Sequence, residues 1–256
     1  MSSTNETGHA KNVANFEQLI SFCKGYGAQY NPARPSLTIM GLEDLLNKSR
    51  GALLGVKAAK TTFDNASNSR QEAFKDLKTF STKVVSAFTA AGVSPLAVNN
   101  AKSIVRKLQG RRAKEIVAVT PEAPAATAPA VEPTVSTADT TEEKRISVSQ
   151  LSYDNQLDNF AKLVQAVSQQ RGYIPNEKEL SVAGLQEKLA NLVTLNTGVV
   201  NTYTHLSNAR ISRNTLLYNP LTGLKQVTAD TKLYVKSIFG SSSPQYKQIS
   251  GIKFTG

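Results

Sequence analysis

The chain has few of the residues that carry most metal and nucleophilic chemistry. Its 256 residues include one cysteine, Cys23, no tryptophan, and two histidines, His9 and His205. A lone cysteine cannot form an internal disulfide, and two histidines are too few for a histidine-based metal cluster. Cys23 lies in the apolar stretch LISFCKG, which predicts a buried, inert thiol. We therefore expect no cofactor and no metal site.

Long hydrophobic runs are also missing. The first residues, MSSTNETGHAKN, are polar and lack the apolar core of a secretory signal peptide, and eighteen apolar residues never occur together. These features predict a cytoplasmic protein without a membrane anchor.

No constellation of residues predicts catalysis. The acid pairs Glu43–Asp44 and Glu142–Glu143 are adjacent in sequence, so neither resembles a converging acid–base pair. Gly25 and Gly27 lack the preceding strand and the further glycines of a phosphate loop. We interpret the protein as a non-enzyme.

Positive charge dominates, and it is unevenly distributed. The net charge is +11, with +9 in residues 1–112, −3 in residues 113–145 and +5 in residues 146–256. Two basic flanks around an acidic centre favour polyanionic partners.

The acidic centre is rich in Ala, Pro, Thr and Glu and has no periodic apolar face. It is typical of a disordered linker.

The sequence repeats on either side of this centre. LTIMGLEDLL at residues 37–46 matches LSVAGLQEKL at residues 180–189, at an offset of 143. The same offset matches NASNSR at residues 65–70 with NARISR at residues 208–213. An offset held over more than about thirty residues indicates an internal duplication of domain size.

Each repeat has helical periodicity. Apolar residues recur in steps of three and four from Leu42 to Phe88 and again from Leu185 to Thr231. A shorter helix is predicted at residues 13–24, and another after Ser94, beginning at Pro95 and ending at Gly110. Asn219 and Pro220 predict a new helix start within the second long stretch, whereas the first is expected only to bend near residues 75–77.

These patterns predict an all-α protein of two homologous antiparallel helical bundles joined by a disordered Pro/Ala-rich linker. The predicted parts are a flexible N-terminus at 1–12, a first bundle at 13–112, the linker at 113–145 and a second bundle at 146–256. In the segments SNARISRNTLLYNPLTGL and SPQYKQISGIKFTG the sequence resembles a family of duplicated helical proteins of about this size that is widespread in Bacteroidetes. That resemblance implies no known activity.

Three arginines project onto the apolar seam of the long helices. Arg70, Arg210 and Arg213 fall there, beside the polar residues Asn65 and Asn208. A charge facing a core is costly unless it is paired and hydrogen-bonded. One interpretation is a buried polar layer in which these arginines bind carbonyls or an acid, and another is a pocket for a phosphate or carboxylate. Exposure on a bent helix is the third. The candidate acids are Asp64, Asp154 and Asp158.

A cluster of cations precedes the linker. Its members are Lys102, Arg106, Lys107, Arg111, Arg112 and Lys114. One interpretation is a solvated basic face that offsets the helix dipole, and the other is a surface that binds a phosphate backbone. No Phe or Tyr lies between Phe88 and Tyr153, so stacking on bases is not expected there.

The sequence thus favours an accessory or architectural binding protein that contacts nucleic acid or a ribonucleoprotein through basic surfaces. Two alternatives remain. One is a protein–protein scaffold of duplicated bundles that binds a protein partner or self-associates, and the other is a small-anion binder that uses Arg70 and Arg213.

Overall fold

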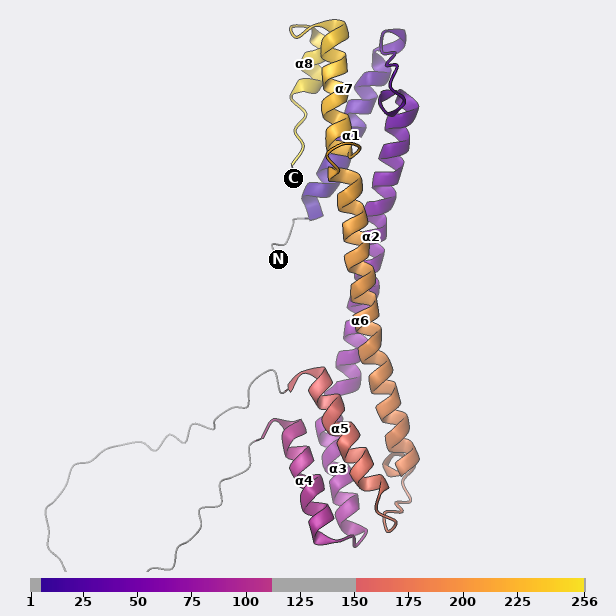
Figure 1. Ribbon diagram of the computed structural model, residues 1–256, viewed down its shortest axis with the longest axis vertical. Helices are drawn as coiled ribbons and strands as arrows, with labels where there is room; N and C mark the ends of the chain where they lie inside the picture. The colour runs from indigo at the N-terminus through magenta and orange to yellow at the C-terminus, as the bar shows by residue number, and fades with distance from the viewer. Residues whose placement is uncertain (1–5, 112–150, 256) are drawn as a thin grey trace, which may run out of the picture. The chain divides into compact units, whose positions relative to one another are not determined.

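The computed structural model describes residues 6–111 and 151–255, and every regular element in these two ranges is a helix (Figure 1). The predicted all-α class is confirmed. The α-helices are α1 (Glu6–Gly25), α2 (Ile39–Lys75), α3 (Leu77–Ala90), α4 (Pro95–Gln109), α5 (Tyr153–Ser168), α6 (Val182–Tyr218), α7 (Leu224–Phe239) and α8 (Pro244–Ser250). Short 3-10 helices are η1 (Gly27–Gln29), η2 (Pro35–Leu37) and η4 (Lys178–Leu180).

The chain forms two compact units, and each unit combines residues from before and after the predicted linker. The first unit comprises Met1–Asn68 and Gly198–Gly256, and the second comprises Ser69–Thr197. These units differ from the predicted bundles at 13–112 and 146–256. Helices α2 and α6 are each 37 residues long, and each contributes one part to the first unit and the other part to the second. An uninterrupted helix cannot fold back to bring both of its ends to one core.

The core of the first unit joins α1 to the C-terminal helices. Helices α1, α7 and α8 pack on one another (Figure 1). From α1, Phe16 and Leu19 are fully buried, and they belong to the same apolar cluster as Leu217, Val235 and Ile249. Each such side chain contributes about 1.5–3 kcal/mol when it is removed from water.

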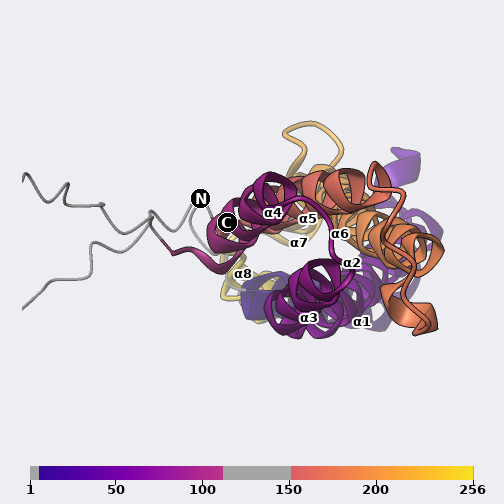
Figure 2. The same cartoon turned by 90° about the horizontal axis from the view of Figure 1, so that it is seen from below.

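The core of the second unit joins α3 and α4 to α5. Helix α4 contacts both α3 and α5 (Figure 2). Phe88 and Leu108 are fully buried in one cluster with Phe160, Leu163 and Leu185. Residues from both sides of the predicted linker are therefore needed to complete this core.

The two long helices begin with the same loop geometry. The hydroxyl of Tyr30 donates to the carbonyl of Leu37 at 2.7 Å, and the hydroxyl of Tyr173 donates to the carbonyl of Leu180 at 2.7 Å. Both tyrosines are buried. At Gly41, which follows the first of these loops, an added Cβ would lie 2.2 Å from the carbonyl oxygen of Pro35, so only glycine fits there.

The long helices end in different ways. Helix α2 stops at Lys75 and α3 starts at Leu77, with Asp76 between them. The expected bend is thus a break between two helices. Helix α6 stops at Tyr218, near the predicted break, but α7 begins later, with Gly223 as its N-cap.

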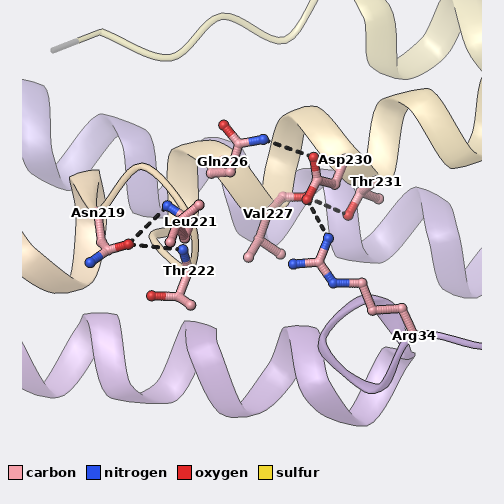
Figure 3. Close-up of polar contacts among 8 residues, drawn as sticks. All are labelled: Arg34, Asn219, Leu221, Thr222, Gln226, Val227, Asp230 and Thr231. Atoms are coloured by element: carbon pink, nitrogen blue, oxygen red, sulfur yellow. Dashed lines mark hydrogen bonds and ion pairs between the residues drawn. The ribbon is translucent and has the colours of Figure 1, made fainter.

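Asn219 has a different role from the one predicted. Its Oδ1 accepts hydrogen bonds from the backbone N–H groups of Leu221 and Thr222, at 2.9 and 3.0 Å (Figure 3). It therefore closes the turn between the helices and does not cap α7. The nearby Arg34 forms an ion pair with Asp230 of α7 at 2.6 Å (Figure 3).

The first helix is longer than predicted. The expectation was a helix at residues 13–24 after a flexible N-terminus at 1–12, but α1 already includes residues 6–12. His9 and Asn12 are buried, and each lies within hydrogen-bond distance of the Tyr218 hydroxyl, at 2.6 and 3.1 Å. Asn12 also binds the backbone of Thr255, so α1 holds the C-terminal segment.

Helix α4 agrees with its prediction. The Oγ of Ser94 accepts the N–H of Ala97 as an N-cap, Pro95 is the first residue, and Gly110 ends the helix in the left-handed region at φ 74°.

None of the helices in the described ranges is long and apolar enough to cross a membrane. The predicted linker at 113–145 lies outside the described residues.

The shared cores generate a prediction about cleavage. We expect a protease site introduced within residues 117–143 to be cut without separating the two halves, because each core contains buried side chains from both. Size-exclusion chromatography of the cleaved protein should give one peak that contains both fragments, with unchanged helical circular dichroism. Two separate helical fragments in native buffer would contradict the shared cores.

Candidate functional site

Helices α3 and α4 form an antiparallel hairpin with a strongly basic surface. Residues 77–111 contain six basic side chains and no acidic one. The members of this set are Lys78, Lys83, Lys102, Arg106, Lys107 and Arg111.

The apolar pattern of each helix places these cations outside the core. Helix α3 buries Leu77, Phe80 and Val84, so the positions of Lys78 and Lys83 face away from the buried stripe. Helix α4 buries Val98, Ala101, Val105 and Leu108, as the sequence predicted. Lys102 and Arg106 are one turn apart on its exposed side.

Two adjoining hollows lie along this hairpin, and together they form what we call the α3–α4 groove. The first has a volume of about 650 Å³ and is lined by Lys78, Lys83 and Arg111 among others. The second has a volume of about 560 Å³ and is lined by Lys102, Arg106 and Arg111 among others. The residues that line both are Thr82, Ser86, Gln109 and Arg111.

Hydrogen bonds hold part of the groove in place. Nε2 of Gln109 donates to Oγ1 of Thr82 at 2.9 Å and links α4 to α3. A guanidinium nitrogen of Arg106 donates to Oγ of Ser103 at 2.9 Å, and both residues line the second hollow. The backbone N–H of Arg111 binds the carbonyl of Arg106 at 2.9 Å just beyond the helix end.

The cations of the groove lack acidic partners in the part of the chain that the structure describes. Seven ion pairs occur there, and none includes a residue of 77–111. They are formed instead by cations of the other helices and loops, such as Lys24 with Glu43 and Lys162 with Asp158. Within residues 6–111 and 151–255, no carboxylate pairs with the cations of the groove, and such a surface attracts anions.

The predicted polyanion-binding cluster is divided by the structure. Lys102, Arg106 and Arg111 line the groove, whereas Lys107 is exposed on α4 and lines neither hollow. Arg112 and Lys114 lie outside the described residues. Sequence reasoning missed Lys78 and Lys83. The uninterrupted absence of Asp and Glu from residue 77 to residue 114 was the signal that could have identified them.

Arg70 belongs to a polar network inside the second unit. Its guanidinium lies 4.0 Å from the centre of the Tyr153 ring and donates to Oδ1 of Asn196 at 3.1 Å. Asn196 in turn donates to Oδ1 of Asp154 at 2.7 Å. Asp154 lies in the first turn of α5, where a negative charge is favourable. The predicted network had the arginine bind an acid or a backbone carbonyl directly, whereas Arg70 binds the amide of Asn196 and is linked to Asp154 only through it.

Arg213 lies in the first unit and is almost completely buried, with 1% of its surface exposed. Its Nε and one terminal nitrogen donate to Oδ1 of Asn214 at 3.1 and 3.0 Å. It lines neither hollow of the groove. Arg213 is therefore a buried polar residue, as one interpretation of the sequence predicted.

The rest of the predicted polar layer is not buried. Arg210 is half-buried, and Asn65 and Asn208 are exposed. The two asparagines were predicted to join the polar layer from positions beside the seam, but both side chains are exposed to solvent.

Burial shifts the pKa of several titratable residues. Burial raises the pKa of the Cys23 thiol to about 12, and Cys23 is 1% exposed. Burial also raises the pKa of Tyr26 to about 12 and moves the pKa of Tyr30 upward. His205 is exposed, and no group of three metal-binding side chains occurs among the residues that the structure describes.

Comparison with known proteins gave no relative. No protein-family model, no curated protein and no solved structure matches the chain. The candidate site is therefore defined by its geometry alone.

The environment of Cys23 predicts a protected thiol. At about pH 8 we expect a disulfide reagent such as DTNB to modify the native protein at least about a thousandfold more slowly than the urea-unfolded chain, because a pKa of about 12 instead of 9.0 removes most thiolate. Absorbance of the released thionitrobenzoate measures both rates. Comparable rates would show that the thiol is accessible.

The Arg70 network predicts a local stability effect. Arg70→Met should lower the free energy of unfolding by about 1–3 kcal/mol, because it removes a hydrogen bond and a cation–π contact and leaves the amide of Asn196 partly unsatisfied. Urea unfolding followed by circular dichroism measures the change. The control Arg171→Met, at an exposed position, should change it by less than about 0.5 kcal/mol. Equal stability of the two variants would refute the network.

Proposed function

We propose that this protein is a non-enzymatic binding protein whose α3–α4 groove holds the phosphates of a nucleic acid, either free or within a ribonucleoprotein. One observation carries the proposal: five cations line two adjoining hollows, and among the residues that the structure describes no carboxylate lines either hollow. Lys and Arg neutralise phosphates and release counterions, which supplies most of the affinity of non-specific nucleic-acid binding.

The other residues of the groove do not favour base contacts. The hydroxyls of Thr82, Ser86 and Ser103 donate to backbone carbonyls one turn earlier, so the cations supply most of the donors for a phosphate. The apolar members of the lining are Val85, Ala87, Val105 and Leu180. Without an aromatic ring in either lining, the groove offers no stacking platform for bases. These features support binding that does not depend on base sequence.

The proposed role is accessory or architectural, in the cytoplasm. We also propose that the chain arose by internal duplication. The sequence offset of 143 supports this, as does the repeated hydrogen bond of Tyr30 with Leu37 and of Tyr173 with Leu180.

The small-anion alternative at the arginines has less support. Arg70 is engaged by Tyr153 and Asn196 within its unit, and the guanidinium of Arg213 is buried beside Asn214. A protein scaffold has no specific observation in its favour. The groove therefore remains the better candidate for the binding site.

The proposal predicts a salt-dependent loss of affinity when groove cations are removed. The triple variant Lys83→Gln, Lys102→Gln, Arg106→Gln should bind a fluorescent single-stranded oligonucleotide at least about tenfold more weakly than wild type at about 50 mM salt. The slope of log affinity against log salt should become shallower by about 2, because each lost phosphate contact on a single strand contributes about 0.7. Fluorescence anisotropy measures both quantities.

A control with the same charge change tests whether position matters. Lys11→Gln, Lys57→Gln and Arg171→Gln remove two lysines and one arginine from exposed positions outside the groove. This variant should stay within about threefold of wild type. Equal losses in the two triple variants would show that net charge, and not the groove, determines binding. Undetectable binding of wild type at low salt would refute the proposed function.

A further inference from the structure

We infer that the α3–α4 groove binds two successive phosphates of one sugar–phosphate strand, with one phosphate in each hollow. This inference rests on the proposed function and specifies the form of the ligand. It requires that the two hollows adjoin, that each hollow has its own cations, and that a hydrogen-bond donor lies at the boundary between them.

The two hollows adjoin because they share part of their lining. Thr82 and Gln109 line both, and the 2.9 Å hydrogen bond between them joins α3 to α4. A bonded pair that contributes to both linings lies at the boundary between them. The bond uses one N–H of Gln109 and leaves its second N–H for an anion, whereas the Thr82 hydroxyl donates to the carbonyl of Lys78 at 3.0 Å.

Each hollow has its own pair of cations. Lys78 and Lys83 line only the first, whereas Lys102 and Arg106 line only the second. Arg111 lines both, so its guanidinium, with five N–H donors, can serve two neighbouring phosphates. An isolated phosphate would leave the cations of one hollow without a partner.

The form of the second hollow favours a fixed phosphate position. The bond from Arg106 to Oγ of Ser103 holds the guanidinium at the wall of this hollow. Oγ of Ser103 is itself tied to the carbonyl of Asn99 at 3.0 Å. An anchored guanidinium loses less conformational entropy on binding a phosphate than a free side chain does.

Because the lining has no aromatic ring, the ligand is recognised through its phosphate chain. The bases are not needed for binding, and a chain of phosphates without bases should be an adequate ligand. The spacing between phosphates, by contrast, decides whether both hollows are filled by one strand.

The experiment compares two base-free probes with the same number of phosphates. In the first probe a propanediol linker joins successive phosphates, which approximates the spacing of a nucleic acid. In the second a flexible dodecanediol linker lets successive phosphates lie far apart, so that filling both hollows with neighbouring phosphates costs more loop-closure entropy. Both carry a fluorescein label, and anisotropy at about 50 mM salt measures their affinity for the full-length protein.

Two single variants report on the two hollows. Lys83→Gln weakens the first hollow, and Arg106→Gln weakens the second. With the closely spaced probe, each variant should lower affinity by about tenfold, because both hollows must be occupied together. With the widely spaced probe, each should lower affinity by about twofold only, since the intact hollow still binds a phosphate.

The control substitution is Lys107→Gln, which is adjacent to Arg106 in sequence but lines neither hollow. It should leave the affinity for both probes within about twofold of wild type. Equal losses for the two probes in Lys83→Gln and Arg106→Gln would overturn the two-phosphate arrangement while leaving the proposed function intact. Failure of wild type to bind either probe or an oligonucleotide would reject both.

Discussion

The fold depends on the burial of apolar helix faces from the N-terminal half of the chain against apolar faces from the C-terminal half. Phe16 and Leu19 of α1 are buried with Leu217 and Val235, and Phe88 and Leu108 are buried with Phe160 and Leu163. If the halves were separated, these side chains would be exposed to water at a cost of about 1.5–3 kcal/mol each. Both compact units therefore form only when the two halves fold together.

The groove depends on the same packing. Helices α3 and α4 carry five cations and no acid, and Arg111 follows α4, so the two helices repel one another electrostatically. Apolar contacts of α4 with α3 and α5, and the bond between Thr82 and Gln109, oppose this repulsion. The cations remain in water, where screening limits the cost of their proximity. A bound polyanion would relieve this repulsion, which is why such a surface favours phosphate ligands.

Two corresponding arginines of the repeat have different surroundings. Arg70 is stabilised by the ring of Tyr153 and, through Asn196, by Asp154. Arg213 is more deeply buried and binds the side chain of its neighbour Asn214. These two arginines at the sequence offset of 143 have different partners, because Arg70 belongs to the second unit and Arg213 to the first.

Local structure was largely predictable. The all-α class, the capping of α4 by Ser94 and Gly110, and the buried stripe of α4 follow from periodicity and capping residues, which act over a few residues. The burial of Cys23 followed from its apolar surroundings in the same way. The positive charge of Lys102, Arg106 and Arg111 could also be predicted, because it follows from the residue types alone.

Tertiary structure alone decided which elements share a core and which cations share a groove. A repeat suggests one bundle per copy, and nothing local reveals that α2 and α6 each divide between two units. Lys78 and Lys83 join Arg111 only because α3 packs antiparallel to α4. Periodicity determines which side of a helix is apolar, whereas long-range packing determines what that side contacts.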